Sequence, residues 1–334
     1  MVSAVIFVAT SCVSPLTGFA FWETNLAYEG ESIYNYLQVK NLSDRTILST
    51  NVLFGVQSVT MKDKGLTGMY YDTALAAPAL ASHADSALIL GMGTGTYARQ
   101  LKQYYPKMNI TGVEIDQKIT DLAGEYFDEP ADIPVTTYDG RAWLAASHDK
   151  YDVIMVDAYQ DITIPFQMSS TEFFTMVREH LNPGGVMVVN MNMISDGQGS
   201  INEALSDTIA SVFGNGNTLT ADVPNTTNRE LFAKKPGSGS EENSMQQASK
   251  ALNLRETTYE RTGSEDLEWY MEEVASRFRK VNEPDSASTI LTDDKAPVEV
   301  LGMHAIDQII ADEAGPYRQI LKDEGFGGLL RAVQ

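Results

Sequence analysis

The most constraining feature of this chain is a glycine-rich turn between an apolar run and a helical pattern, LILGMGTGTYARQ at residues 88–100. Gly91, Gly93 and Gly95 alternate where the chain must turn sharply and let a ligand approach the backbone. The dinucleotide fingerprint G-x-G-x-x-G would require its third glycine at Thr96. The observed G-x-G-x-G spacing is instead typical of folds that bind S-adenosylmethionine, and a purely structural turn is the alternative.

Apolar runs alternate with amphipathic stretches around this turn, which predicts a parallel sheet built from βαβ units in an α/β fold. Upstream, runs rich in β-branched and aromatic residues predict a small antiparallel sheet. We expect strands at 87–90, 109–114, 135–138, 151–157 and 186–191, helices at 70–81, 96–105, 118–127, 141–147, 171–181 and 201–213, and an N-terminal sheet at about 30–63.

Downstream, the runs TLTADV and RELFAKK predict a β-hairpin. The stretch PGSGSEENSMQQ predicts a polar connector. The passage LEWYMEEVASRFRKV then predicts a helix. We divide the chain into an apolar segment, an N-terminal β-region, an α/β domain and a final part made of the polar connector and a helical region. These parts cover residues 1–21, 22–68, 69–236 and 237–334.

Carboxylates follow successive predicted strands. Glu114 ends the second strand, where an acidic side chain can accept hydrogen bonds from both hydroxyls of a ribose. Asp139, in an Asp-Gly turn, could accept a hydrogen bond from an adenine amino group, and Asp157 ends a buried strand with Asp161 four residues further on. Because ligands of open α/β sheets bind outside the carboxyl ends of the strands, all should face the crevice beside the glycine turn. Each could instead be a strand-end, turn or cap residue.

Charge and cysteine content exclude several classes. A formal net charge of −21 argues against binding to nucleic acid or an anionic membrane by bulk electrostatics, and is compatible with a cationic small molecule. The single cysteine, Cys12, excludes an intramolecular disulfide and a cysteine-based zinc site. The four histidines lack the spacing of metal ligands, so we expect no metal.

The N-terminal residues 1–21 carry no charge and have about the length that a bilayer-spanning helix requires. Pro15 and Gly18 make such a helix a mediocre one, and a signal peptide would lack its basic n-region. We expect a membrane-proximal segment, the alternative being a buried strand or helix of the globular domain.

The combined order and spacing of several passages resembles the polyamine aminopropyltransferases, the spermidine synthase family, and especially members attached to a transporter-like membrane region. The passages are SIYNYLQV, GVQSV, GLTGMYYDTALAAP, GMGTGT, GVEID, YDGRAWL, YDVIMVDAY, STEFFTMVREHLNPGG and LTDDKAPVE. The resemblance implies a Rossmann-like S-adenosylmethionine-type transferase fold behind a small N-terminal antiparallel β-domain. It also implies transfer of an aminopropyl group from decarboxylated S-adenosylmethionine to an amine such as putrescine, with release of methylthioadenosine. The resemblance further implies a homodimer in the cytoplasm, which residues 1–21 could attach to the membrane.

Carried over by position, the resemblance assigns roles to individual residues. Glu114 would hold the ribose, Asp139 with Gly140 the adenine, and Asp157 would be the base. Gln57 would lie near the nucleoside or the amine, and Tyr159 on the substrate side. The departures are Asn35 for a glutamine, Tyr70-Tyr71 for a Tyr-His pair, Thr94 for an aspartate that contacts the aminopropyl ammonium, and Asp161, which follows Asp157 by four residues rather than three.

These departures keep other functions open. Without a carboxylate at Thr94, intact S-adenosylmethionine would meet less repulsion, which favours a methyltransferase on the same scaffold. A non-catalytic domain that senses nucleosides or polyamines is a third hypothesis. A nicotinamide-dependent oxidoreductase ranks last because of the glycine spacing.

Overall fold

The structure is a computed structural model that describes residues 23–51, 56–63, 65–159, 164–192, 197, 199–237, 244–286, 288–305 and 322. The apolar segment 1–21 and Asp161 lie outside these ranges, so a membrane role for the former stays a prediction. Within the described ranges, no helix is both long and apolar enough to cross a bilayer.

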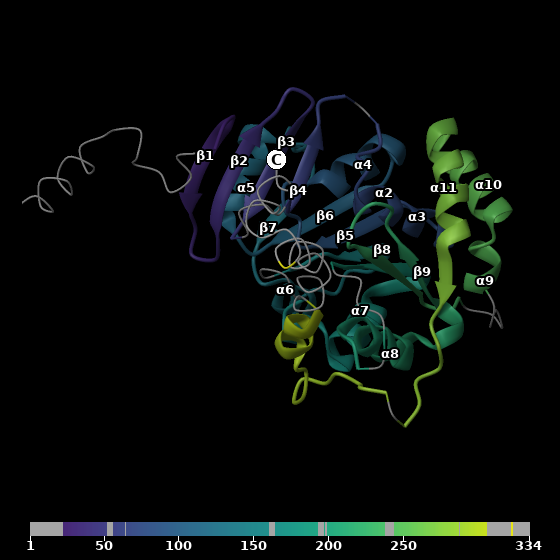
Figure 1. Ribbon diagram of the computed structural model, residues 1–334. Coiled ribbons are helices and arrows are strands. Elements are labelled where there is room, and N and C mark those ends of the chain that lie inside the picture. The colour runs from purple at the N-terminus through teal and green to yellow at the C-terminus, as the bar shows by residue number, and fades with distance from the viewer. Residues whose placement is uncertain are drawn as a thin grey trace, which may run out of the picture.

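A large mixed sheet forms the centre of the molecule (Figure 1), with its strands in the order β12-β10-β11-β9-β8-β5-β6-β7. The pairs from β9 to β7 are parallel and those from β9 to β12 are antiparallel. The strands are β5 (Ser86–Leu90), β6 (Asn109–Glu114), β7 (Val135–Thr137), β8 (Tyr151–Val156), β9 (Leu181–Met191), β10 (Thr218–Asp222), β11 (Arg229–Lys234) and β12 (Phe278–Lys280).

The parallel half of this sheet reverses its winding at β5. The chain moves outward from β5 to β6 and β7, and then returns to place β8 on the other side of β5. A crevice forms at such a switch point, outside the carboxyl ends of the two central strands. The glycine turn follows β5 and Asp157 follows β8, so the topology brings these two predicted features together.

Helices cover both faces of the sheet because the strands are apolar on both sides. Ile89, Met155 and Val188 point toward one face, whereas Leu88, Ile154 and Val189 point toward the other. The first face packs against α2 (Tyr70–Ala74), α3 (Ala76–Leu80), α4 (Thr96–Tyr104), α10 (Ala251–Thr262) and α11 (Glu265–Arg277), and the second against α6 (Gly140–Ala146), α7 (Thr171–His180) and α8 (Ile201–Phe213).

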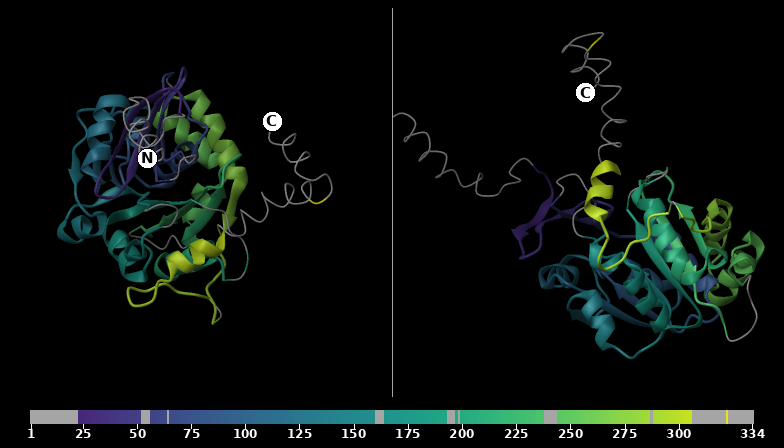
Figure 2. Two further views of the ribbon diagram at one scale, coloured as in Figure 1. Left: turned by 60° about the vertical axis from the view of Figure 1, so that its left-hand side comes forward. Right: turned by 90° about the horizontal axis from the view of Figure 1, so that it is seen from below.

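A separate antiparallel sheet precedes the central one. Its strands follow chain order, β1 (Leu26–Glu31), β2 (Tyr36–Asn41), β3 (Arg45–Thr50) and β4 (Ser58–Met61). Its buried face, with Leu37 and Leu48, packs against Leu122 of α5 (Gln117–Tyr126), which fixes the small sheet over the carboxyl edge of the large one. Figure 1 and the right-hand view of Figure 2 show this sheet (purple) and the α10–α11 pair (green) at opposite ends of the molecule.

The predicted elements of the α/β domain are confirmed. Most of their ends shift by a residue or two, whereas β9 begins at Leu181, five residues before the strand predicted at 186–191. The predicted helix at 70–81 is two short helices that meet at Leu75. The residues NPGG lie inside the bounds of β9, where the register to β8 shifts between Tyr151 and Val153. Strand β1 was not predicted.

The end of the predicted C-terminal helix was wrong. Residues Phe278–Lys280 form strand β12 instead, antiparallel to β10. The Phe278 ring packs edge-on against Phe232, with 5.6 Å between centroids. This contact with the sheet, together with the backbone pairing, outweighs a helical pattern that is weak beyond Arg277.

Candidate active site

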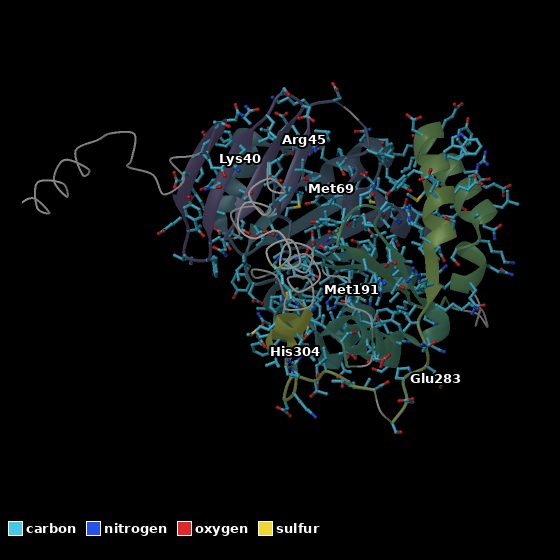
Figure 3. All side chains as sticks on the ribbon, in the orientation of Figure 1. Lys40, Arg45, Met69, Met191, Glu283 and His304 are labelled. Atoms are coloured by element: carbon cyan, nitrogen blue, oxygen red, sulfur yellow. The ribbon has the colours of Figure 1, made fainter. Side chains whose placement is uncertain are left out.

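A cavity of about 330 Å³ lies between the N-terminal sheet and the carboxyl ends of β5, β6 and β8. Figure 3 labels two residues that mark the surrounding elements, Met69 just before α2 and Met191 at the end of β9. Ten of the residues predicted for the site line the cavity: Asn35, Gln57, Tyr71, Gly91, Gly93, Glu114, Asp139, Gly140, Asp157 and Tyr159.

The glycine turn is shaped by a close approach of two backbones. Gly91 has φ +88°, and a Cβ atom added there would lie 2.4 Å from the carbonyl oxygen of Asp157. No side chain fits in that space, and the backbone conformation disfavours an L-residue. Gly95, also left-handed at φ 78°, is the N-cap of α4. The turn therefore holds the first backbone amides of α4 and the end of β8 in one fixed arrangement.

Glu114 is anchored at the wall of the cavity by backbone groups. Its Oε2 accepts a hydrogen bond from the Gly93 amide at 2.8 Å, and its Oε1 accepts one from the Asp116 amide at 3.0 Å. Burial raises the pKa of Glu114, and the backbone hydrogen bonds oppose that rise. Each carboxyl oxygen retains a lone pair for a ligand hydroxyl, so the side chain is oriented for a diol such as a ribose.

Asp157 is held by two side chains that sequence reasoning did not connect to it. The Tyr70 hydroxyl donates to Asp157 Oδ2 at 2.6 Å, and the Asn190 amide donates to Oδ1 at 3.0 Å. Burial raises the pKa of Asp157 to about 7, although both hydrogen bonds lower it. A carboxyl group with this pKa, fixed in a cavity, is suited to accept a proton near neutral pH.

Two tyrosines stack behind this carboxyl group. The rings of Tyr70 and Tyr71 lie 4.0 Å apart between centroids, tilted by 36°. Tyr71 lines the cavity, and its hydroxyl donates to the backbone carbonyl of Gln57 at 3.1 Å. Burial raises the pKa of both hydroxyls, so they stay protonated and act as donors. The pair thereby ties α2 to the N-terminal sheet and to Asp157.

Asp139 lies at the opposite end of the cavity. It is the N-cap of α6, and its Oδ1 accepts a hydrogen bond from the Ala142 amide at 2.8 Å. The side chain lines the cavity wall together with Tyr138 and Gln167. An amino group of a planar ring, seated beside Tyr138, fits this wall.

Other predicted residues lie differently. Tyr70, Thr94 and Gly95 do not line the cavity, and the fully buried Thr94 hydroxyl has no hydrogen-bond partner within the described ranges. The amide of Asn35 is already bonded to Asp116 and Asn51. The Tyr159 hydroxyl donates to the Asn190 carbonyl and accepts from the Asn192 amide at 3.1 Å.

Sequence reasoning missed Asn190, Ser58, Tyr138 and Gln167. Asn190 is the clearest case, because a polar side chain inside the apolar run VMVVNM of β9 was a visible signal. Ser58 and Tyr138 lie within predicted β-segments and Gln167 lies between predicted elements, and no pattern singles out any of the three. Of the described residues, no group of three or more His, Cys, Asp or Glu side chains is arranged to hold a metal ion.

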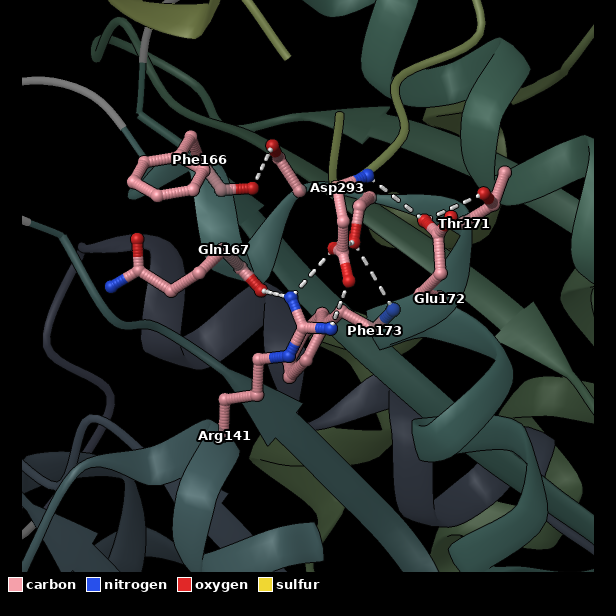
Figure 4. Close-up of polar contacts among 9 residues, drawn as sticks. Arg141, Phe166, Gln167, Thr171, Glu172, Phe173 and Asp293 are labelled. Carbon is pink, nitrogen blue, oxygen red and sulfur yellow. Dashed lines mark hydrogen bonds and ion pairs between the residues drawn. The ribbon is translucent and has the colours of Figure 1, made fainter. Parts of the chain in front are cut away.

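A polar cluster fixes the C-terminal segment beneath the wall that contains Asp139 and Gln167 (Figure 4). Arg141 of α6 forms two parallel hydrogen bonds to Asp293, 2.7 Å from Nη1 and 2.6 Å from Nη2, and also donates to the carbonyl of Gln167 at 2.7 Å. Ser170, the N-cap of α7, donates to Asp293 at 2.5 Å. One guanidinium thus joins α6, the cavity-lining Gln167 and the C-terminal loop.

Comparisons with known proteins agree with this geometry. Residues 69–235 match the family model described as the spermine/spermidine synthase domain. The chain is 99% identical to a probable polyamine aminopropyl transferase of Bifidobacterium longum over 334 residues, which are 100% of this chain and 75% of the relative. It is 28% identical to a polyamine aminopropyltransferase of Vibrio vulnificus over 209 residues, 60% of this chain and 69% of that one.

Solved structures show the same fold. A probable spermidine synthase from Corynebacterium glutamicum superposes with a TM-score of 0.57 at 21% identity, covering 80% of this chain and 99% of that one. A spermidine synthase from Thermotoga maritima gives a TM-score of 0.57 at 18% identity, with 78% and 85% covered. A cavity over a switch point, a glycine turn with Glu114, and a family match over the same residues lead to one conclusion: this chain belongs to the spermine/spermidine synthase family.

Proposed function

We propose that this chain is an aminopropyltransferase that moves the aminopropyl group of decarboxylated S-adenosylmethionine to an amine and releases methylthioadenosine. Support comes from the family membership and from the names of its relatives, which are polyamine aminopropyltransferases. The observation that carries the proposal is Asp157, a fixed carboxyl group with a pKa of about 7 in the same cavity as Glu114.

In the proposed reaction, the nucleoside lies along the wall from Glu114 to Asp139. Glu114 would accept hydrogen bonds from the ribose hydroxyls, and Asp139 with the Gly140 turn would receive the adenine. The sulfonium then lies near the glycine turn, and the aminopropyl carbon attached to sulfur faces Asp157.

The acceptor nitrogen must lose a proton before it can attack. Asp157, ionised and oriented by Tyr70 and Asn190, accepts that proton. A new C–N bond forms while the C–S bond breaks, and the electron pair of that bond neutralises the sulfonium. The products are the extended amine and neutral methylthioadenosine, with no metal required for charge balance.

A methyltransferase is the second candidate, since the glycine turn carries Thr94 and no carboxylate that would repel intact S-adenosylmethionine. The two cofactors therefore serve as the test. Purified protein is incubated with each cofactor and a mixed amine library, and the products are identified by mass spectrometry. Aminopropylated amines with methylthioadenosine support the proposal, whereas methylated products with S-adenosylhomocysteine support the alternative.

The Asp157→Asn variant tests the assigned base. We expect its kcat to fall on the order of 10²–10⁴-fold, with methylthioadenosine affinity changed less than threefold, because the nucleoside contacts lie on the other wall. Asp149→Asn, at an exposed position before β8, is the matched control. If Asp157→Asn turned over as fast as the wild-type chain, Asp157 would not be the base. The homodimer and the cytoplasmic location expected from the resemblance stay predictions.

A further inference from the structure

One buried carboxyl group has no role in the site described so far. Glu230 lies in β11, is fully buried, and neither of its carboxyl oxygens has a hydrogen-bond partner within the described ranges. Burying a carboxyl group without a partner is costly, and an apolar residue would fill the same place without that cost. Such a group therefore points to a function.

The sheet places Glu230 beside the proposed base. Glu230 pairs with Asn190 across β11 and β9, and Asn190 donates to Asp157 at 3.0 Å. Paired residues of neighbouring strands point to the same face. With strands about 4.8 Å apart, the backbone of Glu230 lies roughly 10 Å from that of β8. The side chains of Glu230, Asn190 and Asp157 thus lie in a row across one face of the sheet, the same face to which Ile89 and Met155 point.

The charges around Glu230 decide its protonation. Burial, and after it the neighbouring Asp157, raise the pKa of Glu230 well above its usual value, which favours the protonated form of Glu230 beside an ionised Asp157. Buried Tyr97 and Tyr159 also have raised pKa values, to which Glu230 contributes. Other ionisable groups on the helices that cover this face include Tyr70, Tyr71 and Asp72 of α2, Arg99, Lys102 and Tyr104 of α4, Arg255 and Arg261 of α10, and Tyr270 and Arg277 of α11.

We propose that Glu230 and Asp157 act as an acidic pair, in which Glu230 releases its proton when a second positive charge enters the cavity, so that the site prefers a diamine to a monoamine. The inference rests on the proposed function. Asp157 balances the first ammonium group. The other carboxylates that line the cavity, Glu114 and Asp139, are assigned to the nucleoside, so the buried Glu230 supplies the negative charge for the second ammonium group through space.

In this arrangement Glu230 does not touch the substrate. It is a positioning residue that acts through the electrostatic field of the cavity. The proton it releases passes to solvent, so the binding of a diamine is coupled to the release of one more proton than the binding of a monoamine.

Isothermal titration calorimetry tests this coupling. The protein is saturated with methylthioadenosine and titrated with 1,4-diaminobutane or butylamine at pH 7.5, in two buffers of different ionisation enthalpy. The wild-type chain should release up to one more proton with the diamine than with the monoamine. In Glu230→Gln that difference should vanish, and the diamine should bind on the order of tenfold more weakly, with affinities for butylamine and methylthioadenosine unchanged.

Asp207→Asn is the matched control, because Asp207 is a buried carboxyl group with a raised pKa on α8, which covers the opposite face of the sheet. It should behave as wild type. Glu230→Leu should reproduce the loss of proton release and should melt no lower than wild type, since it replaces a buried polar group without a partner by an apolar one.

A Glu230→Gln variant that retains the diamine preference and the extra proton would overturn the inference. Aminopropyl transfer is measured in parallel on the wild-type chain, so the two failures are distinct. Transfer without a Glu230-dependent diamine preference leaves the proposed function standing and the acidic pair refuted. A Glu230-dependent preference for the diamine without aminopropyl transfer leaves the acidic pair standing and refutes the proposed function.

Discussion

At the scale of single residues, the pKa of the proposed base results from opposing contributions. Burial raises the pKa of Asp157 to about 7, and the hydrogen bonds from Tyr70 and Asn190 lower it. Asp157 must be ionised to accept a proton, so activity should rise with pH and level off above about pH 7. The pKa is thus set by two neighbours that can be changed without touching the carboxyl group.

Tyr70→Phe removes one of these hydrogen bonds, at 2.6 Å, and leaves the ring stack on Tyr71 in place. The carboxylate loses a donor, so its pKa rises and the acidic limb of the kcat profile should move up by on the order of one pH unit. The profile of kcat against pH between 5 and 9 measures this. Tyr105→Phe, a buried tyrosine of the same core without a hydroxyl partner in the described part of the chain, is the control. An unmoved limb in Tyr70→Phe would contradict the mechanism.

At the scale of elements, the turn between β5 and α4 depends on an absent side chain. Gly91→Ala would place a methyl group 2.4 Å from the Asp157 carbonyl oxygen, in a backbone conformation with φ +88°. We expect a loss of about 2–4 kcal/mol in the free energy of unfolding and weaker binding of methylthioadenosine. Urea unfolding and calorimetry measure the two. Gly124→Ala in α5, where the added Cβ meets nothing within 4 Å, should stabilise the chain by about 0.5–1 kcal/mol.

The Arg141–Asp293 pair links α6 to the C-terminal loop. Arg141→Lys keeps the charge but cannot form two parallel bonds, so the wall with Gln167 should loosen. Because the pair is partly exposed, the expected loss of stability is only about 1 kcal/mol, with a several-fold loss of methylthioadenosine affinity. Arg45→Lys, in an exposed pair with Asp44, is the control and should change neither. An Arg141 variant with unchanged nucleoside affinity would limit this cluster to a structural role.

At the scale of the whole molecule, the net charge of −21 should attract cationic substrates over long distances. We expect kcat/KM for a diamine to fall several-fold as sodium chloride rises from about 20 to 300 mM, because the Debye length shortens. The affinity for methylthioadenosine, which is uncharged, should change little over the same range. Equal salt dependence of both would indicate a change in the protein rather than loss of steering.

Local patterns predicted much of this architecture. The glycine turn, Glu114, Asp139 and Asp157 each follow a strand with a clear apolar pattern, so their common position followed from the rule for open α/β sheets. Strand β12 was missed because its three residues are held by contacts with β10, which no local pattern reports. The partners Tyr70 and Asn190 were not connected to Asp157, since they lie 87 and 33 residues away along the chain and only the fold brings them together.

The strand direction of the central sheet reverses at β11, so the two sides of the region around Asp157 come from different parts of the chain. The described residues that line the cavity, and would hold the nucleoside, come no later in the chain than Met168, whereas Asn190 and Glu230, on the side of Asp157, come from β9 and the antiparallel β11. The two halves meet at a single carboxyl group. If Glu230 and Asp157 act as the proposed acidic pair, substitutions in β9 and β11 should change which amine is accepted while the residues that line the cavity keep their geometry, so substrate choice would be open to redesign one strand at a time.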